Sequence, residues 1–257
     1  MKVFIILSIL SLSLLFFILV IFLSGIVQTD GIDYINLLKN DEFLSALVFT
    51  FKSATLATIL AFLFGVPIGF YLSRFKGVMQ GIFDTVFDIP IVIPPLIVGV
   101  LFLSLFNNAL FPFFNMFIFN IYGAIVVQFF IALPFTIKLS KAAFDSIPSL
   151  YESIAMTLGA NYIRAIYDTT FKIAFSGIFS GVVLAFLRCF GEFGATLIVG
   201  GGIPGKTENI PINIYINMAS GKFEHALAAS VITIFFAGIG LFVIRLMFQQ
   251  KNTPKTS

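Results

Sequence analysis

Six long apolar segments, separated by short polar ones, most constrain what this chain can fold into. Each is long enough for a helix that crosses the hydrocarbon core of a bilayer, which takes about 20 residues. With 59% hydrophobic and 11% charged residues among 257, the chain is too apolar for a soluble globular domain. The sequence therefore predicts an all-α, polytopic membrane protein with six transmembrane helices. The predicted segments are Val3–Val27, Phe43–Phe75, Phe83–Phe106, Phe117–Leu139, Ile173–Val199 and Ala226–Phe248.

Basic residues between the segments predict the orientation, because Lys and Arg that flank a span stay in the cytoplasm. The first segment lacks a small-x-small cleavage pattern, so we expect it to be retained, with the N-terminus inside the cell. Both termini are then cytoplasmic in a multi-pass protein of the cell (inner) membrane, and the net charge of +3 requires no nucleic acid. The cytoplasmic side receives Lys2, Arg74, Lys76, Lys138, Lys141, Arg164, Lys172, Arg245, Lys251 and Lys255, and the outer side receives Lys39, Lys206 and Lys222.

The longest polar interval, Ser140–Lys172, predicts a helical hairpin, which we call the finger. Ser149 as N-cap and Glu152 three residues later predict a capping box at the start of its first helix. Gly159 permits a sharp turn, and Asn161 can cap the second helix. The finger is either presented to a partner or lies in the membrane interface. Its apolar face is formed by Leu150, Ile154, Ala155, Leu158, Ile163, Ile166 and Tyr167.

The finger resembles the cytoplasmic loop of the permease subunits of ATP-binding-cassette (ABC) importers. That loop reads Glu-Ala-Ala, three residues, then Gly, and Ala155, Gly159 and Ala160 keep its frame. Ser153 and Ile154 replace the Glu and the first Ala of the motif. The resemblance implies that the finger is a coupling helix that docks in a groove of an ATPase subunit. The residues it implies for coupling are Glu152, Ser153, Ala155, Leu158, Gly159 and Ala160.

Arg188 and Glu192 place two opposite charges in the fifth apolar segment. Each alone would cost about 2.5–3.5 kcal/mol at a helix centre, and a spacing of four residues lets them pair. Gly191 and Gly194 should let another helix approach closely. The pair is either a packing device or part of a solute pathway.

Prolines predict bends in two other segments, because each proline removes a backbone hydrogen bond. Pro67 lies in the second segment, and Pro90, Pro94 and Pro95 lie in the third. The sequence leaves open whether such a bend is a static kink or a moving gate.

The fifth segment and its surroundings are similar to the molybdate/tungstate branch of these permeases. The resemblance implies a type I ABC importer transmembrane domain that forms a homodimer with a second copy, binds two cytoplasmic ATPase subunits and receives its oxyanion from an external binding protein. Sulfate is the alternative cargo, and a stand-alone secondary transporter is the alternative of another class. The resembling runs are Gly191–Leu197, Gly202–Thr207, Ile214-Tyr215 and Ile89–Leu96, and the residues expected along the pathway are Arg188, Glu192, Thr196, Pro94 and Pro95.

We expect three parts along the chain: an N-terminal helix with an external loop over residues 1–42, the permease domain over 43–248, and a cytoplasmic tail over 249–257.

Gly200–Thr207 fits the G-x-x-x-x-G-K-[ST] pattern of nucleotide-binding loops. That pattern needs a preceding strand and a following helix, and here a membrane helix precedes it. We therefore expect no cofactor in this chain, with ATP and Mg on the partner ATPase subunit. Lys206 either guides an anion or is a solvated loop charge. Cys189 and His225 are each the sole residue of their kind, which predicts no metal site and no catalytic residue.

Overall fold

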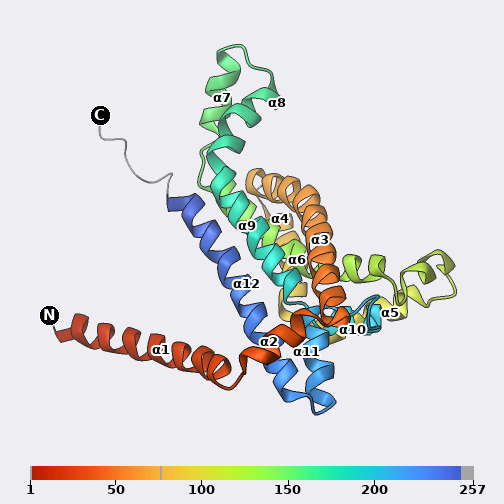
Figure 1. Ribbon diagram of the computed structural model, residues 1–257. Helices are drawn as coiled ribbons and strands as arrows, with labels where there is room; N and C mark the ends of the chain where they lie inside the picture. The colour runs from red at the N-terminus through yellow and green to blue at the C-terminus, as the bar shows by residue number, and fades with distance from the viewer. Residues whose placement is uncertain (1, 76, 250–257) are drawn as a thin grey trace.

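The computed structural model describes residues 2–75 and 77–249, and within these ranges every regular element is helical (Figure 1). Lys76, Lys251 and Lys255, which entered the predicted orientation, lie outside the described residues, as does the predicted tail beyond residue 249. The elements are α1 (Lys2–Val27), α2 (Gly31–Leu38), α3 (Asp41–Arg74), α4 (Val78–Val92), α5 (Pro95–Phe106), the 3₁₀-helix η1 (Pro112–Phe117), α6 (Ile121–Asp145), α7 (Leu150–Thr157), α8 (Tyr162–Ala165), the π-helix η2 (Ile166–Phe171), α9 (Lys172–Phe190), α10 (Gly194–Gly200), α11 (Ile210–Ala219) and α12 (Phe223–Gln249).

Five helical stretches of the described chain are long and apolar enough to cross a membrane: α1, α3, α6, the stretch from α8 to α9, and α12. The third predicted segment is not one such helix, because it is interrupted after Val92 and bends by 104° between α4 and α5. If this bent pair counts as one span, the predicted number of six is reached. The expected bend at the prolines is therefore a break in the helix.

The fifth predicted segment also needs a correction. Its continuous helix ends at Phe190, and after a break at residues 191–193 the separate helix α10 runs from Gly194 to Gly200. Pro67, in contrast, does not break the second segment, because α3 continues through it to Arg74.

Helices α3, α6 and α9 pack together as the centre of the molecule. Small residues allow the backbones of α3 and α6 to approach. A Cβ atom on Gly65 would lie 2.9 Å from Cβ of Thr136, and one on Gly69 would lie 2.9 Å from the carbonyl oxygen of Ile137. Two ion pairs join α4 to α6: Lys138 with Asp88 at 2.8 Å and Lys141 with Asp84 at 3.4 Å.

Helix α1 extends away from this body and contacts α12 at its C-terminal end, near Gly25 (Figure 1). The finger, made of α7, α8 and the turn between them, projects beyond the ends of the central helices. The bends after α4 and α9 lie toward the opposite end of the molecule from the finger. The fold therefore separates the two predicted functional regions.

Candidate functional site

Arg188 and Glu192 lie where α9 ends. Gly191 follows the last residue of α9, and Glu192 then lies between two helices. One carboxylate oxygen of Glu192, Oε1, accepts a hydrogen bond of 2.9 Å from the backbone N–H of Ala195 in the first turn of α10. A negative group at this place satisfies a free N–H and favours the start of the helix. The expected position of the pair at a helix centre was therefore wrong, and the break supplies the reason.

The predicted pairing of the two charges is confirmed. Nη1 of Arg188 donates to Oε2 of Glu192 at 2.5 Å. The side chain of Glu192 is 1% exposed, whereas that of Arg188 is 28% exposed. The backbone carbonyl of Glu192 also accepts a 2.6 Å hydrogen bond from Nδ2 of Asn209, which ties this break to the start of α11. The carboxylate is thus enclosed and satisfied, while the guanidinium remains accessible.

A cavity of about 220 Å³ lies between the α4–α5 break and the α9–α10 break. It is large enough for several waters or a small ion. Four of the five residues expected along the pathway line it: Pro94, Pro95, Arg188 and Glu192. Residues more than ninety positions apart in sequence therefore meet at one site.

Thr196, the fifth expected pathway residue, does not line this cavity. Its side chain is fully buried, and its hydroxyl accepts a 3.2 Å hydrogen bond from Nε2 of Gln128 in α6. Here Thr196 attaches α10 to α6.

Two glycines bring the broken helices α5 and α10 together. A Cβ atom on Gly99 would lie 2.9 Å from Cα of Ala195, and one on Gly194 would lie 3.0 Å from the backbone nitrogen of Leu96. The close approach predicted for Gly194 is confirmed. At Gly191 it was wrong, because only Leu187 of its own helix lies within 4 Å of such a Cβ.

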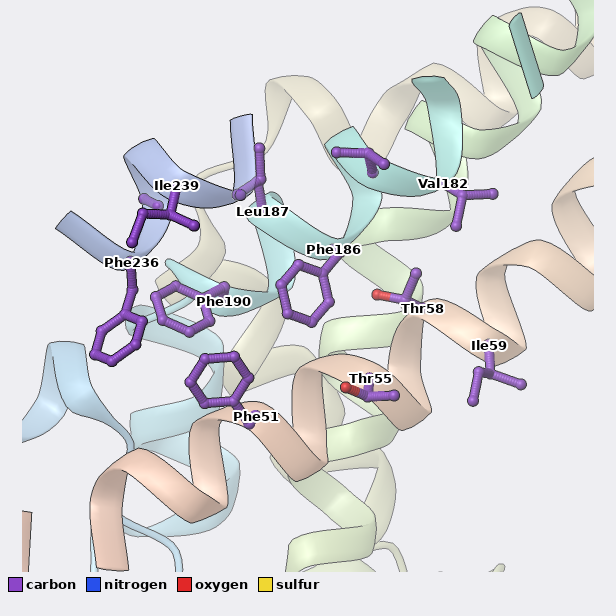
Figure 2. A pocket seen from close by; sticks show the side chains of 13 residues that line it. Phe51, Thr55, Thr58, Ile59, Val182, Phe186, Leu187, Phe190, Phe236 and Ile239 are labelled. Atoms are coloured by element: carbon purple, nitrogen blue, oxygen red, sulfur yellow. The ribbon is translucent and has the colours of Figure 1, made fainter. Parts of the chain in front are cut away.

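A larger cavity of about 450 Å³ lies between α3, α9 and α12 (Figure 2). Phe51, Phe186, Phe190 and Phe236 surround it, and none of its lining residues is charged. Burial of an ion among these rings would carry the full cost of desolvation. An oxyanion therefore finds a cation in the smaller cavity and none in this one.

The finger forms as a helix, a turn and a second helix. Gly159 has φ +92° in the turn, a conformation that favours glycine. The side chain of Asn161 accepts a 2.8 Å hydrogen bond from the backbone N–H of Arg164, so the predicted cap of the second helix is confirmed. Beside the turn, Leu158 and Ile163 are 84% and 78% exposed. Ser153 is exposed, and Ala155 and Ala160 are half-buried.

The predicted capping box does not form. Ser149 has helical backbone angles and no side-chain hydrogen bond to the helix. Glu152 points instead to Arg74 at the end of α3, with Oε1 of Glu152 2.7 Å from Nη2 of Arg74. The hydroxyl of Thr170 donates to the same oxygen at 2.6 Å. Glu152 therefore connects the finger to α3 and to η2.

We call Arg74, Glu152 and Thr170 the latch. The side chains of Glu152 and Arg74 are 7% and 22% exposed, so the pair is mostly enclosed. Nη1 of Arg74 also donates to the carbonyl oxygen of Phe144 at 3.3 Å. Sequence reasoning missed this contact because 78 residues separate Arg74 from Glu152. One signal for a different role of Glu152 was available: it lies one position before Ser153, where the motif has its Glu.

The run that resembles a nucleotide-binding loop lies between two helices, α10 and α11. The hydroxyl of Thr207 donates to the carbonyl of Gly200 at 2.6 Å and accepts from the N–H of Ile203 at 3.1 Å. These bonds close the loop on itself, with Lys206 exposed at its surface. Within the described residues, no group of three or more His, Cys, Asp or Glu side chains could hold a metal ion.

Comparisons with known proteins agree with this architecture. The family model described as "Binding-protein-dependent transport system inner membrane component" matches residues 65–252, more than half of the chain. The molybdate/tungstate transport system permease protein WtpB of Pyrococcus furiosus is 34% identical over 204 residues, which cover 78% of this chain and 76% of that protein. The probable transport system permease protein NifC of Clostridium pasteurianum is 29% identical over 252 residues, which cover 95% and 88%.

A solved structure shows the same fold. A chain of the bacterial alginate ABC transporter, in complex with its alginate pentasaccharide-bound periplasmic protein, superposes with a TM-score of 0.68 at 18% identity and covers 95% of this chain and 92% of its own. The expected type I ABC importer fold is thereby confirmed. The chain belongs to the family of binding-protein-dependent transport system inner membrane components, the permease subunits of ABC importers.

Proposed function

We propose that this chain translocates molybdate or tungstate as a homodimer, driven by two cytoplasmic ATPase subunits and supplied by an external oxyanion-binding protein. Both termini and the finger lie in the cytoplasm, and the charged cavity lies toward the outer side. The excess of basic residues around the finger supports this orientation. ATP and Mg act on the ATPase subunits.

The observation that carries the proposal is the accessible guanidinium of Arg188 in a cavity between two helix breaks. Its remaining N–H groups can donate to a tetrahedral oxyanion. Glu192 already neutralises much of the charge, so the attraction is shallow enough for the ion to leave again, as conduction requires. The names of relatives such as WtpB support molybdate and tungstate as the oxyanions.

The finger supports coupling to an ATPase. Its exposed apolar side chains, Leu158 and Ile163 among them, form a surface that a soluble partner can cover. The latch attaches this surface to α3 and to η2, so that a movement of the finger would be passed on to both.

A double substitution, Arg188→Gln with Glu192→Gln, tests the role of the cation without leaving a buried carboxylate unpaired. We expect ATP-driven tungstate uptake by the reconstituted complex to fall roughly ten- to a hundredfold, since a hydrogen bond to a charged group contributes about 1.5–3 kcal/mol. The oxyanion affinity of the separate binding protein should not change. Uptake equal to wild type would remove Arg188 from the pathway.

The same assay separates the alternative functions. If the complex takes up sulfate in preference to molybdate and tungstate, its cargo is sulfate and the proposed mechanism is unchanged. Uptake by the chain alone, driven by an ion gradient without ATPase subunits, would overturn the proposal in favour of a secondary transporter.

A further inference from the structure

A second polar cavity, of about 490 Å³, lies near the N-terminal end of α3. Asp41, Ser45 and Lys52 line it along one face of α3, and Lys206 lines it from the loop between α10 and α11. It shares no lining residue with the cavity at Arg188. Two basic side chains and one carboxylate give this lining a net positive charge.

Neither lysine forms an ion pair with another described residue. No ion pair in the described part of the chain includes Lys52 or Lys206, although Asp41 lines the same cavity. Both side chains are exposed. Two unpaired ammonium groups in one concave site favour a ligand with at least two negative charges.

The position of Lys52 along α3 indicates how it can share one site with Lys206. Lys52 lies eleven residues after Asp41, which is about 16 Å along the helix axis. Long side chains in a helix lean toward its N-terminus, so the ammonium group is directed back toward the loop that carries Lys206. Lys52 and Lys206 thus line one concavity between helix and loop, which a small ion can enter.

Lys52 also needs an explanation because of its neighbours. Exposed Leu56 lies one turn beyond it on the same helix, which is long and apolar enough to cross a membrane. A lysine in such a helix is costly, and ionisable residues in such segments are most often functional. Under the proposed orientation Lys206 lies on the outer side, where basic residues are few, and Lys52 lies in the outer half of the span formed by α3.

We propose that Lys52 and Lys206 form an outer site that binds a tetrahedral oxyanion with two negative charges. The identity of the oxyanion as tungstate or molybdate rests on the proposed function. The two ammonium groups act as point charges that hold the ion weakly at the outer face of the permease.

Chemical protection of the lysines tests this site without transport. The full chain in lipid nanodiscs is acetylated with an amine-reactive ester, in sodium tungstate or in sodium chloride of equal ionic strength, and labelling is followed for each lysine by peptide mass spectrometry. At ten times the dissociation constant, tungstate should slow the labelling of Lys52 and Lys206 about elevenfold. Lys39 and Lys222 are the internal controls and should label at the same rate in both salts.

A Lys206→Gln variant asks whether the two lysines share one ion. Tungstate should then protect Lys52 several-fold less, whereas a Lys222→Gln variant should leave that protection unchanged. The proposal is overturned if tungstate protects neither lysine, or slows all four lysines equally. It is also overturned if only the external binding protein protects them, since that result makes the surface a protein docking site. Normal ATP-driven uptake without protection would refute this site alone, and protection without uptake would refute the proposed function alone.

Discussion

The latch permits a prediction whose size follows from its geometry. Arg74→Met removes the guanidinium and keeps most of the apolar stem, so it leaves the carboxylate of Glu152 enclosed, with Thr170 as its remaining partner. The removal of one partner from a buried ion pair costs about 3–5 kcal/mol. Glu152→Gln leaves Arg74 with the Phe144 carbonyl and 22% exposure, so the expected loss is smaller, about 1.5–3 kcal/mol.

The double variant should be less destabilised than the sum of the two single variants. Neither charge is then left alone in the enclosed site, and contacting residues typically show interaction energies of about 0.5–3 kcal/mol. We expect a value near the upper end, about 2–3 kcal/mol, because the pair is short and only 7% exposed on the Glu152 side.

Hydrogen exchange of finger peptides measures how much each substitution lowers the free energy of opening the finger. A loss of about 3–5 kcal/mol should speed the exchange of α7 amides by roughly two to four orders of magnitude, up to the limit set by the opening energy in wild type. The matched control is the exposed pair of Arg164 in α8 and Asp168 in η2, 3.3 Å apart with side chains 75% and 41% exposed. Its removal should change exchange far less, because water and salt screen it.

Two outcomes would refute the reasoning about the latch. If the two single substitutions are additive, Arg74 and Glu152 do not stabilise each other. If the exchange of the finger is unchanged while ATPase coupling falls, Glu152 acts on the partner subunit, and the contact with Arg74 is incidental.

Two further substitutions test the turn of the finger and a buried carboxyl group. At Gly159, Trp and Ala impose the same backbone strain at φ +92°, about 1–2 kcal/mol, and a Cβ meets nothing within 4 Å. We therefore expect that only the bulky Gly159→Trp abolishes solute-stimulated ATP hydrolysis, measured on the assembled complex. An equal loss with Gly159→Ala would assign the effect to strain. Burial raises the pKa of Glu208 above its usual value, with Glu42 also raising it and the hydrogen bond from Asn213 lowering it. The folded chain then holds this proton more tightly than the unfolded chain, so stability should fall as the pH rises from about 4.5 through the raised pKa, and Glu208→Gln should remove that part of the decline. The unfolding midpoint can be followed with a thiol-reactive dye at Cys189, which is 1% exposed, and parallel pH curves for both proteins would contradict the assignment.

The sequence was sufficient for the features that depend on local pattern. The long apolar segments predicted helices of membrane length, the spacing of Arg188 and Glu192 predicted their pairing, and Asn161 predicted the second helix of the finger. Each of these depends on residues within a few turns of one another. The break after Phe190 was not apparent, because Gly191 and Gly194 lie in an apolar run that is equally compatible with one continuous helix.

Contacts between distant segments could not be predicted in this way. Nothing in the local pattern indicates that Glu152 faces Arg74 and not its own helix end, since a capping box uses the same spacing. The meeting of Pro94 with Arg188 likewise depends on the 104° angle between α4 and α5. Such contacts are set by the packing of whole helices.

The helical stretch from α8 to α9 connects the two regions that the fold separates. Thr170 of the latch and Arg188 of the cavity lie eighteen residues apart on it, about 27 Å, close to the thickness of the hydrocarbon core. The π-helix η2 lies on the finger side of this stretch and contains Thr170. Since π-helical turns are frequent at functional sites and are less regular than α-helix, η2 is the place where a movement of the finger could be absorbed before it reaches Arg188. Because Arg74 holds the same carboxylate as Thr170, the finger is attached to α3 as well as to η2. If the finger couples to an ATPase as proposed, loss of the latch should therefore free its movement from both elements.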